Sequence, residues 1–108
     1  MKLERWEEAL DVARSLCEQE PNLSGGYIHT AYCLHELGLT EDARRTLLEG
    51  PQFLRKEAVF YYNLGCYQTQ LGDLNDAKRM LKRSFDMDEK LRAVAKADPD
   101  LEVLWVEL

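Results

Sequence analysis

Apolar residues recur three and four positions apart along most of the chain, which is the spacing of one face of an α-helix. Glycine and proline divide this pattern into segments, with one long interruption at residues 20–26 and another at Gly50-Pro51. The segments predict helices over residues 3–19, 25–37, 40–49, 53–71, 74–87, 89–97 and 99–107. We therefore predict an all-α protein.

The helical pattern repeats with a period of 34 residues. Similar residues recur in one register: Ala9, Ala43 and Ala77; Leu37-Gly38 and Leu71-Gly72; Tyr27 and Tyr61; Ala31 and Gly65. A fixed period of this length indicates stacked supersecondary units. We predict a single domain over residues 1–108, made of a half-repeat (1–21), two full repeats (24–57 and 58–91) and C-terminal capping helices (89–108).

Small residues within each repeat predict how its helices end and pack. Gly38 and Gly72 follow the last apolar residue of a helix, where a left-handed backbone commonly ends it. Thr40 or Asp73 is then expected to accept hydrogen bonds from the free amides of the next helix. The recurring alanines, with Ala31 and Gly65 facing them, are expected where two helix axes come close.

The last segment begins with Asp98 as a predicted cap and Pro99 in the first turn. It carries an apolar stripe at helical spacing: Leu101, Leu104, Trp105 and Leu108. We expect this helix to cap the last repeat, as solenoid ends require. The alternative is a self-ligand that occupies the binding groove, or a dimer contact.

The repeat resembles the tetratricopeptide repeat over residues 4 to about 90. The best copy, residues 61–89, has the expected residue type at Tyr61, Leu64, Gly65, Leu71, Gly72, Ala77, Leu81 and Phe85. The resemblance implies a right-handed α-α superhelix of about 2.5 repeats. It also implies a scaffold whose first helices line a concave peptide-binding groove.

The resemblance assigns nine residues to that groove: Ile28, Tyr32, His35, Val59, Tyr62, Asn63, Cys66, Thr69 and Gln70. Only Asn63 fits the basic carboxylate clamp of the chaperone-docking members of the family. An apolar groove with tyrosines instead suits a peptide with apolar anchors. The alternative is that these side chains pack against the C-terminal helix.

Net charge and cysteine content argue against some classes of partner and indicate a cellular location. A net charge of −6 and a pI near 4.9 argue against nucleic-acid or anionic membrane partners. Three widely spaced cysteines form no disulfide framework, and the charged first ten residues do not resemble a secretory signal. We expect a cytoplasmic protein.

Candidate chemistry is sparse. His29 and Cys33 have metal-ligand spacing, and Cys66 could lie nearby, but zinc needs about four converging ligands. No glycine-rich loop or oriented Cys-His pair is evident. We expect no catalytic residues, metal or cofactor. The basic residues Lys78, Lys82, Arg79 and Arg83 are expected to form a solvated helix face.

The sequence therefore predicts a protein–protein interaction module, an adaptor or scaffold, that binds a protein or peptide partner in its concave groove. The alternative is a structural solenoid segment that stacks on further repeats or self-associates through the N-terminal half-repeat. Trp6, on a first helix that lacks a preceding partner helix, motivates this alternative.

Overall fold

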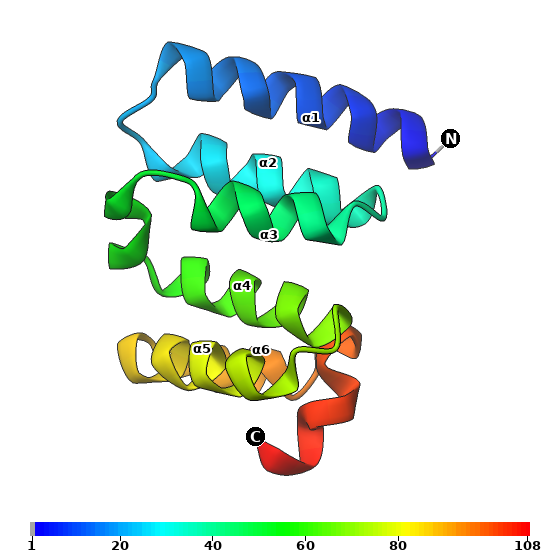
Figure 1. Ribbon diagram of the computed structural model, residues 1–108, viewed down its shortest axis with the longest axis vertical. Coiled ribbons are helices and arrows are strands. Elements are labelled where there is room, and N and C mark those ends of the chain that lie inside the picture. The colour runs from blue at the N-terminus through cyan, green and yellow to red at the C-terminus, as the bar shows by residue number, and fades with distance from the viewer. Residues whose placement is uncertain (1) are drawn as a thin grey trace. The chain divides into compact units, whose positions relative to one another are not determined.

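The structure is a computed structural model that describes residues 2–108, with side chains from Glu4 onward (Figure 1). The described residues form helices and no strands: α1 (Lys2–Gln19), α2 (Ser24–Glu36), α3 (Thr40–Leu48), the 3₁₀-helix η1 (Gln52–Lys56), α4 (Ala58–Gln70), α5 (Leu74–Met87), α6 (Lys90–Ala95) and the 3₁₀-helix η2 (Pro99–Glu107). The all-α prediction is confirmed. None of these described helices combines the length and apolar character needed to cross a membrane.

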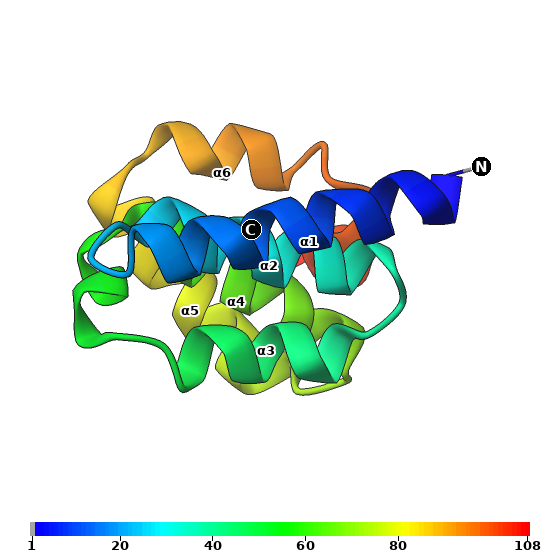
Figure 2. The ribbon, with the colours of Figure 1, turned by 90° about the horizontal axis from the view of Figure 1, so that it is seen from above.

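The chain divides into two compact units, Met1–Leu54 and Arg55–Leu108, which we call unit 1 and unit 2. The single domain predicted over residues 1–108 stays a prediction. In unit 1, α2 packs against both α1 and α3, and the three helices run side by side with alternating direction (Figures 1 and 2). The buried apolar side chains of this unit are Leu10, Ala13, Ala31, Cys33, Leu34, Ala43, Leu47 and Leu54.

In unit 2, α4 and α5 form a second antiparallel helix pair, α6 packs against α5, and η2 packs against α4. The largest buried side chains come from all parts of the unit: Phe60, Leu64, Tyr67, Leu81, Phe85, Leu101 and Leu104. The last two lie in η2. The segment after the predicted repeats is therefore part of the core of unit 2.

The two helix pairs share one turn geometry. Gly38 has φ of 83° and Gly72 has φ of 85°, the left-handed conformation that was predicted. The amide of the residue after each glycine donates a hydrogen bond to the carbonyl oxygen five residues earlier, from Leu39 to Leu34 and from Asp73 to Gln68. The glycine amide donates to the carbonyl oxygen three residues earlier, from Gly38 to His35 and from Gly72 to Thr69. This is the Schellman pattern, and it satisfies the last carbonyls of α2 and α4.

The predicted side-chain caps of α3 and α5 are wrong. Asp73 precedes α5 with φ of −89° and ψ of 68°, and its side chain makes no capping hydrogen bond. The Schellman turn holds this residue outside the extended conformation that a capping residue normally adopts. Thr40 is the first residue of α3 rather than its cap. Its hydroxyl lies 3.0 Å from Nδ1 of His35.

Small side chains lie where α2 meets α3 and where α4 meets α5, as predicted, whereas the equivalent Ala9 of α1 is only half-buried. Ala31, Ala43 and Ala77 are fully buried. A Cβ atom added at Gly65 would lie 2.7 Å from Cγ of Leu81 and 3.2 Å from the carbonyl oxygen of Ala77. The α4–α5 pair is therefore packed so closely that only glycine fits at position 65 without a shift.

The predicted continuous helix over residues 53–71 is wrong. The 3₁₀-helix η1 ends at Lys56, Glu57 has extended backbone, and α4 begins at Ala58. Side-chain packing within unit 1 explains the break. Leu54 is fully buried, and the Phe53 ring meets the Tyr27 ring edge-on with centroids 6.1 Å apart. These contacts outweigh the helical preference of the local sequence.

The last predicted helix, over residues 99–107, forms, but its helix type differs from the prediction. Asp98 caps it as predicted, accepting a hydrogen bond from the Asp100 amide at 3.0 Å. The segment is a 3₁₀-helix, whose three residues per turn place positions three apart on one face. Leu101 and Leu104 are accordingly buried, whereas Trp105 remains 36% exposed.

Candidate functional site

Unit 1 carries an open, apolar hollow between α1 and α2. Its volume is about 530 Å³. The lining residues are Trp6, Ala9, Val12, Ala13 and Leu16 from α1, and His29, Tyr32 and Cys33 from α2. We call this site the α1–α2 hollow. Among the predicted groove residues, it contains Tyr32.

The hollow follows from the two apolar faces of α1. One face, with Leu10 and Ala13, is buried within unit 1. Close packing of α1 on α2 is possible because position 26 is glycine: a Cβ there would lie 2.9 Å from Sγ of Cys17. The second face presents Val12 to the hollow with 70% of the side chain exposed. The apolar surface of α1 is therefore wider than the part that α2 covers.

Two aromatic rings form one wall of the hollow. Trp6 and Tyr32 meet edge to face, with centroids 5.5 Å apart and an interplanar angle of 67°. This arrangement is favourable for aromatic pairs. Tyr32 is nevertheless 41% exposed. The pair therefore offers a rigid, amphipathic contact surface of the kind that often dominates binding energy.

The chemistry of the hollow is weak. Burial, with Glu36 nearby, raises the pKa of the Cys33 thiol, so the thiol stays protonated and poorly nucleophilic at neutral pH. His29 and Cys33, which have metal-ligand spacing, both line the hollow. In residues 2–108, however, the structure contains no group of three or more His, Cys, Asp or Glu residues arranged to hold a metal ion.

The remaining predicted residues of unit 1 lie elsewhere on α2. Ile28 and His35 are half-buried and do not line the α1–α2 hollow. His35 contacts Thr40 across the turn. The imidazole therefore helps to hold the α2–α3 turn.

In unit 2, the C-terminal segment covers much of the predicted α4 surface. The Tyr62 hydroxyl donates a hydrogen bond to Oδ2 of Asp98 at 2.7 Å, and Cys66 Sγ lies 3.9 Å from the same oxygen. Gln70 Nε2 donates to the carbonyl oxygen of Asp100 at 2.8 Å. These contacts correspond to the alternative in which the groove residues pack against the C-terminal helix.

The other predicted residues of α4 differ in exposure. Thr69 is buried and its hydroxyl donates to the Gly65 carbonyl oxygen at 2.8 Å. Asn63 is half-buried, and Val59 is exposed. Burial and Asp98 raise the pKa values of both Tyr62 and Cys66. Both groups remain protonated at neutral pH.

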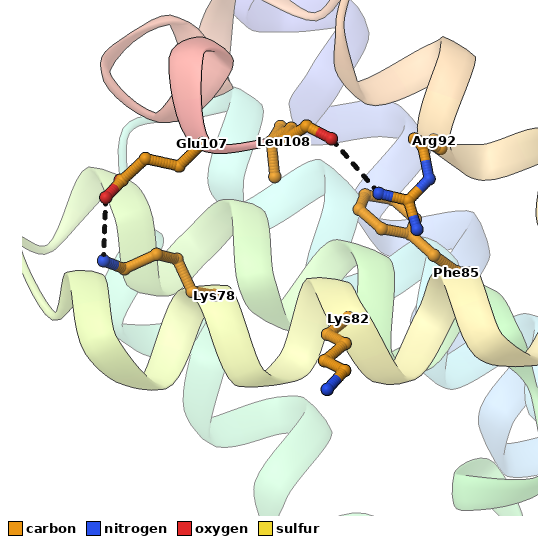
Figure 3. A pocket seen from close by; sticks show the side chains of 6 residues that line it. All are labelled: Lys78, Lys82, Phe85, Arg92, Glu107 and Leu108. Atoms are coloured by element: carbon orange, nitrogen blue, oxygen red, sulfur yellow. Dashed lines mark hydrogen bonds and ion pairs between the residues drawn. The ribbon is translucent and has the colours of Figure 1, made fainter.

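A second hollow of about 280 Å³ lies under the end of the C-terminal segment (Figure 3). Lys78 pairs with Glu107 at 3.2 Å, and Arg92 Nη1 donates to the Leu108 carbonyl oxygen at 3.1 Å. The Arg92 guanidinium also lies over the Phe85 ring, 4.8 Å from its centroid. Lys82 points away from these contacts (Figure 3). The cations therefore hold the segment and do not converge on a common ligand.

Sequence reasoning did not assign Val12 and Leu16 to a site, and it named Trp6 only as a stacking residue. The available signal was the width of the apolar surface of α1, which extends from residues 10 and 13 to residues 9, 12 and 16. No protein-family model, curated protein or solved structure matches the chain.

Proposed function

We propose that this chain is a protein–protein interaction module of tetratricopeptide type, and that the α1–α2 hollow is where it holds a partner segment. The observation that carries the proposal is the hollow itself, an apolar surface with aromatic walls on which Val12 and Tyr32 stay exposed. The tetratricopeptide character is supported by matched helix starts: α2 and α4 begin 34 residues apart, as do α3 and α5.

The energetics favour binding at this surface. Complete burial of one large apolar side chain is worth about 1.5–3 kcal/mol. A partner that covers Val12, Tyr32 and the open side of Trp6 gains from several such groups at once. The concave groove predicted from the resemblance remains a proposal for α2, whereas on α4 the C-terminal segment already contacts Tyr62 and Gln70.

We propose no catalytic role. The one thiol in the hollow, Cys33, has a raised pKa, which opposes nucleophilic chemistry at neutral pH. The three cysteines are free thiols, in keeping with the proposed cytoplasmic location.

Paired surface variants test the proposal. Val12→Asp places a charge in the hollow, whereas Val106→Asp makes the same change at a fully exposed valine of unit 2. Both variants should fold, because neither side chain is buried. Partners captured by the wild-type chain in its native extract and identified by mass spectrometry should be lost with Val12→Asp and kept with Val106→Asp. Equal capture by both variants would refute the site.

A second candidate function is stacking of the hollow on another solenoid segment or on a second copy of the chain. The half-buried Trp6 on α1 favours it. Light scattering at increasing protein concentration separates the two. A mass that rises in the wild type and not in Val12→Asp supports self-association, whereas a constant monomer mass disfavours it.

A further inference from the structure

We infer that the α1–α2 hollow receives an amphipathic α-helix from another protein, with apolar anchors on one face and lysine or arginine residues beside them. This inference rests on the proposed function and specifies the partner. Three observations carry it: the predominantly apolar lining of the hollow, its length along α1, and the charge of unit 1.

The lining favours a helical partner over an extended one. Its polar side-chain groups are few: the Trp6 indole, the His29 imidazole, the Tyr32 hydroxyl and the Cys33 thiol. The backbone groups of α1 and α2 are bonded within their own helices. An extended peptide would bury one N–H and one C=O per residue here with too few partners. A helix satisfies its own backbone and presents only side chains.

The dimensions suit about three helical turns. The lining on α1 runs from Trp6 to Leu16, which at 1.5 Å per residue is about 15 Å. Anchors at positions i, i+3 or i+4, and i+7 of a partner helix span about 10 Å. One such set therefore fits along the hollow, with its central anchor beside Val12.

The net negative charge of unit 1 favours a partner with basic residues. Its sequence contains ten aspartate and glutamate residues and five lysine and arginine residues. Two of the basic residues, Arg44 and Arg45, form ion pairs within α3. On the other side of Val12, the adjoining hollow on α1 includes Asp11. Glu36 lies near Cys33 of the lining. An approaching helix therefore meets a unit with an excess of acidic side chains, two of which adjoin the hollow.

The same charge disfavours a second copy of the chain as the occupant. A symmetric dimer through α1 would bring two acidic surfaces together. The chain's own C-terminal segment does not supply the basic residues either, because residues 98–108 contain four acidic and no basic side chains.

Display selection on the immobilised full chain tests the inference. Two libraries are compared: one randomised on the exposed face of a stable single-helix scaffold, and one of unstructured peptides of equal length. Enriched clones are measured against the wild type, Val12→Asp and the matched control Val106→Asp. Circular dichroism and a thermal melt establish that both variants are folded.

The expected result is enrichment from the helical library, with apolar residues at i, i+3 or i+4, and i+7 and basic residues beside them. Their affinity should fall by about tenfold or more in Val12→Asp and stay unchanged in Val106→Asp. It should also weaken with added salt.

Other outcomes overturn one claim or both. Clones that depend on Val12 but come only from the unstructured library, or carry acidic flanks, overturn this inference and leave the proposed function standing. Self-association that Val12→Asp abolishes also overturns the inference, because a second copy then fills the hollow. If no clone depends on Val12, both the site and the inference fail.

Discussion

The helices α2 and α4 begin 34 residues apart and each opens an antiparallel helix pair, yet their surfaces are covered to different extents. On α4, Tyr62 and Gln70 are hydrogen-bonded to residues 98–100 of the C-terminal segment. On α2, Tyr32 is paired with Trp6 and is still 41% exposed. The α4 surface is thus covered by the C-terminal segment, whereas part of the α2 surface stays exposed. The open surface is the better candidate for binding.

The largest expected effect is on the covered side. Leu101→Ala removes a fully buried side chain of the C-terminal segment. We expect a loss of about 2–5 kcal/mol in the free energy of unfolding, measured by urea titration. Val103→Ala in the same 3₁₀-helix is the control, because Val103 is exposed. Equal, small losses in both variants would show that the segment is not part of the core.

The next effect tests the close packing of α4 on α5. Gly65→Ala forces a methyl group against Leu81 and the Ala77 carbonyl, which typically costs about 1–3 kcal/mol. Better helix propensity returns up to about 1 kcal/mol. We therefore expect a net loss of stability in a thermal melt. The control is Gly25→Ala on α2, where nothing lies within 4 Å, and this variant should be stabilised.

A smaller effect concerns the contact between α4 and the C-terminal segment. Tyr62→Phe removes the hydrogen bond to Asp98, and bonds to charged groups are worth about 1.5–3 kcal/mol. We expect a loss near the lower figure, because Asp98 is only half-buried and water can replace the donor. Chemical denaturation at pH 7 measures it. An unchanged midpoint would mean that the contact adds nothing to stability.

The same contact predicts a pH dependence. Burial and Asp98 raise the pKa of Tyr62 above its ordinary value of 10.0 and that of Cys66 above 9.0. The unfolded chain therefore releases these protons first, and stability present below about pH 9 is lost as the pH rises. The double variant Tyr62→Phe with Cys66→Ala should lose less stability between pH 8 and pH 10.5 than the wild type, by urea titration at each pH.

The smallest effect is expected in the hollow of unit 1. Val12 is 70% exposed, so Val12→Asp should change the free energy of unfolding by no more than about 0.5 kcal/mol. The comparison with Leu101→Ala then distinguishes buried side chains that stabilise the fold from exposed side chains that are proposed to bind a partner. A large destabilisation by Val12→Asp would assign this valine to the core instead.

Local sequence predicted the features that depend on local physics. The left-handed conformation of Gly38 and Gly72 follows from the need to end a helix within one residue, and the sequence places glycine at both points. The close approach at Ala43 and Ala77 follows from side-chain size alone. These features require no knowledge of distant contacts.

The predictions that were wrong concern helix boundaries and helix type, which depend on contacts that the local sequence pattern does not reveal. The break at Glu57 depends on the burial of Leu54 and on the packing of Phe53 against Tyr27. The 3₁₀ form of residues 99–107 has the same apolar spacing at Leu101 and Leu104 as an α-helix, so periodicity alone does not separate the two.

The candidate site could be predicted only in part. Tyr32 was assigned from the resemblance, and Trp6 was named only for the alternative of self-association. Val12 was missed because a valine on an amphipathic helix usually faces the core. Its exposure becomes visible only when α2 is seen to occupy the other face of α1.

The buried leucines of η2 also bear on how the protein is made. The ribosome synthesises the chain from the N-terminus towards the C-terminus at about 5–20 residues per second. The residues of unit 1 all precede Arg55 and are synthesised first. Unit 2 lacks Leu101 and Leu104 until residues 98–108 have emerged. During that interval the side of α4 that contacts η2 is uncovered, so an apolar surface of unit 2 is exposed until the segment arrives.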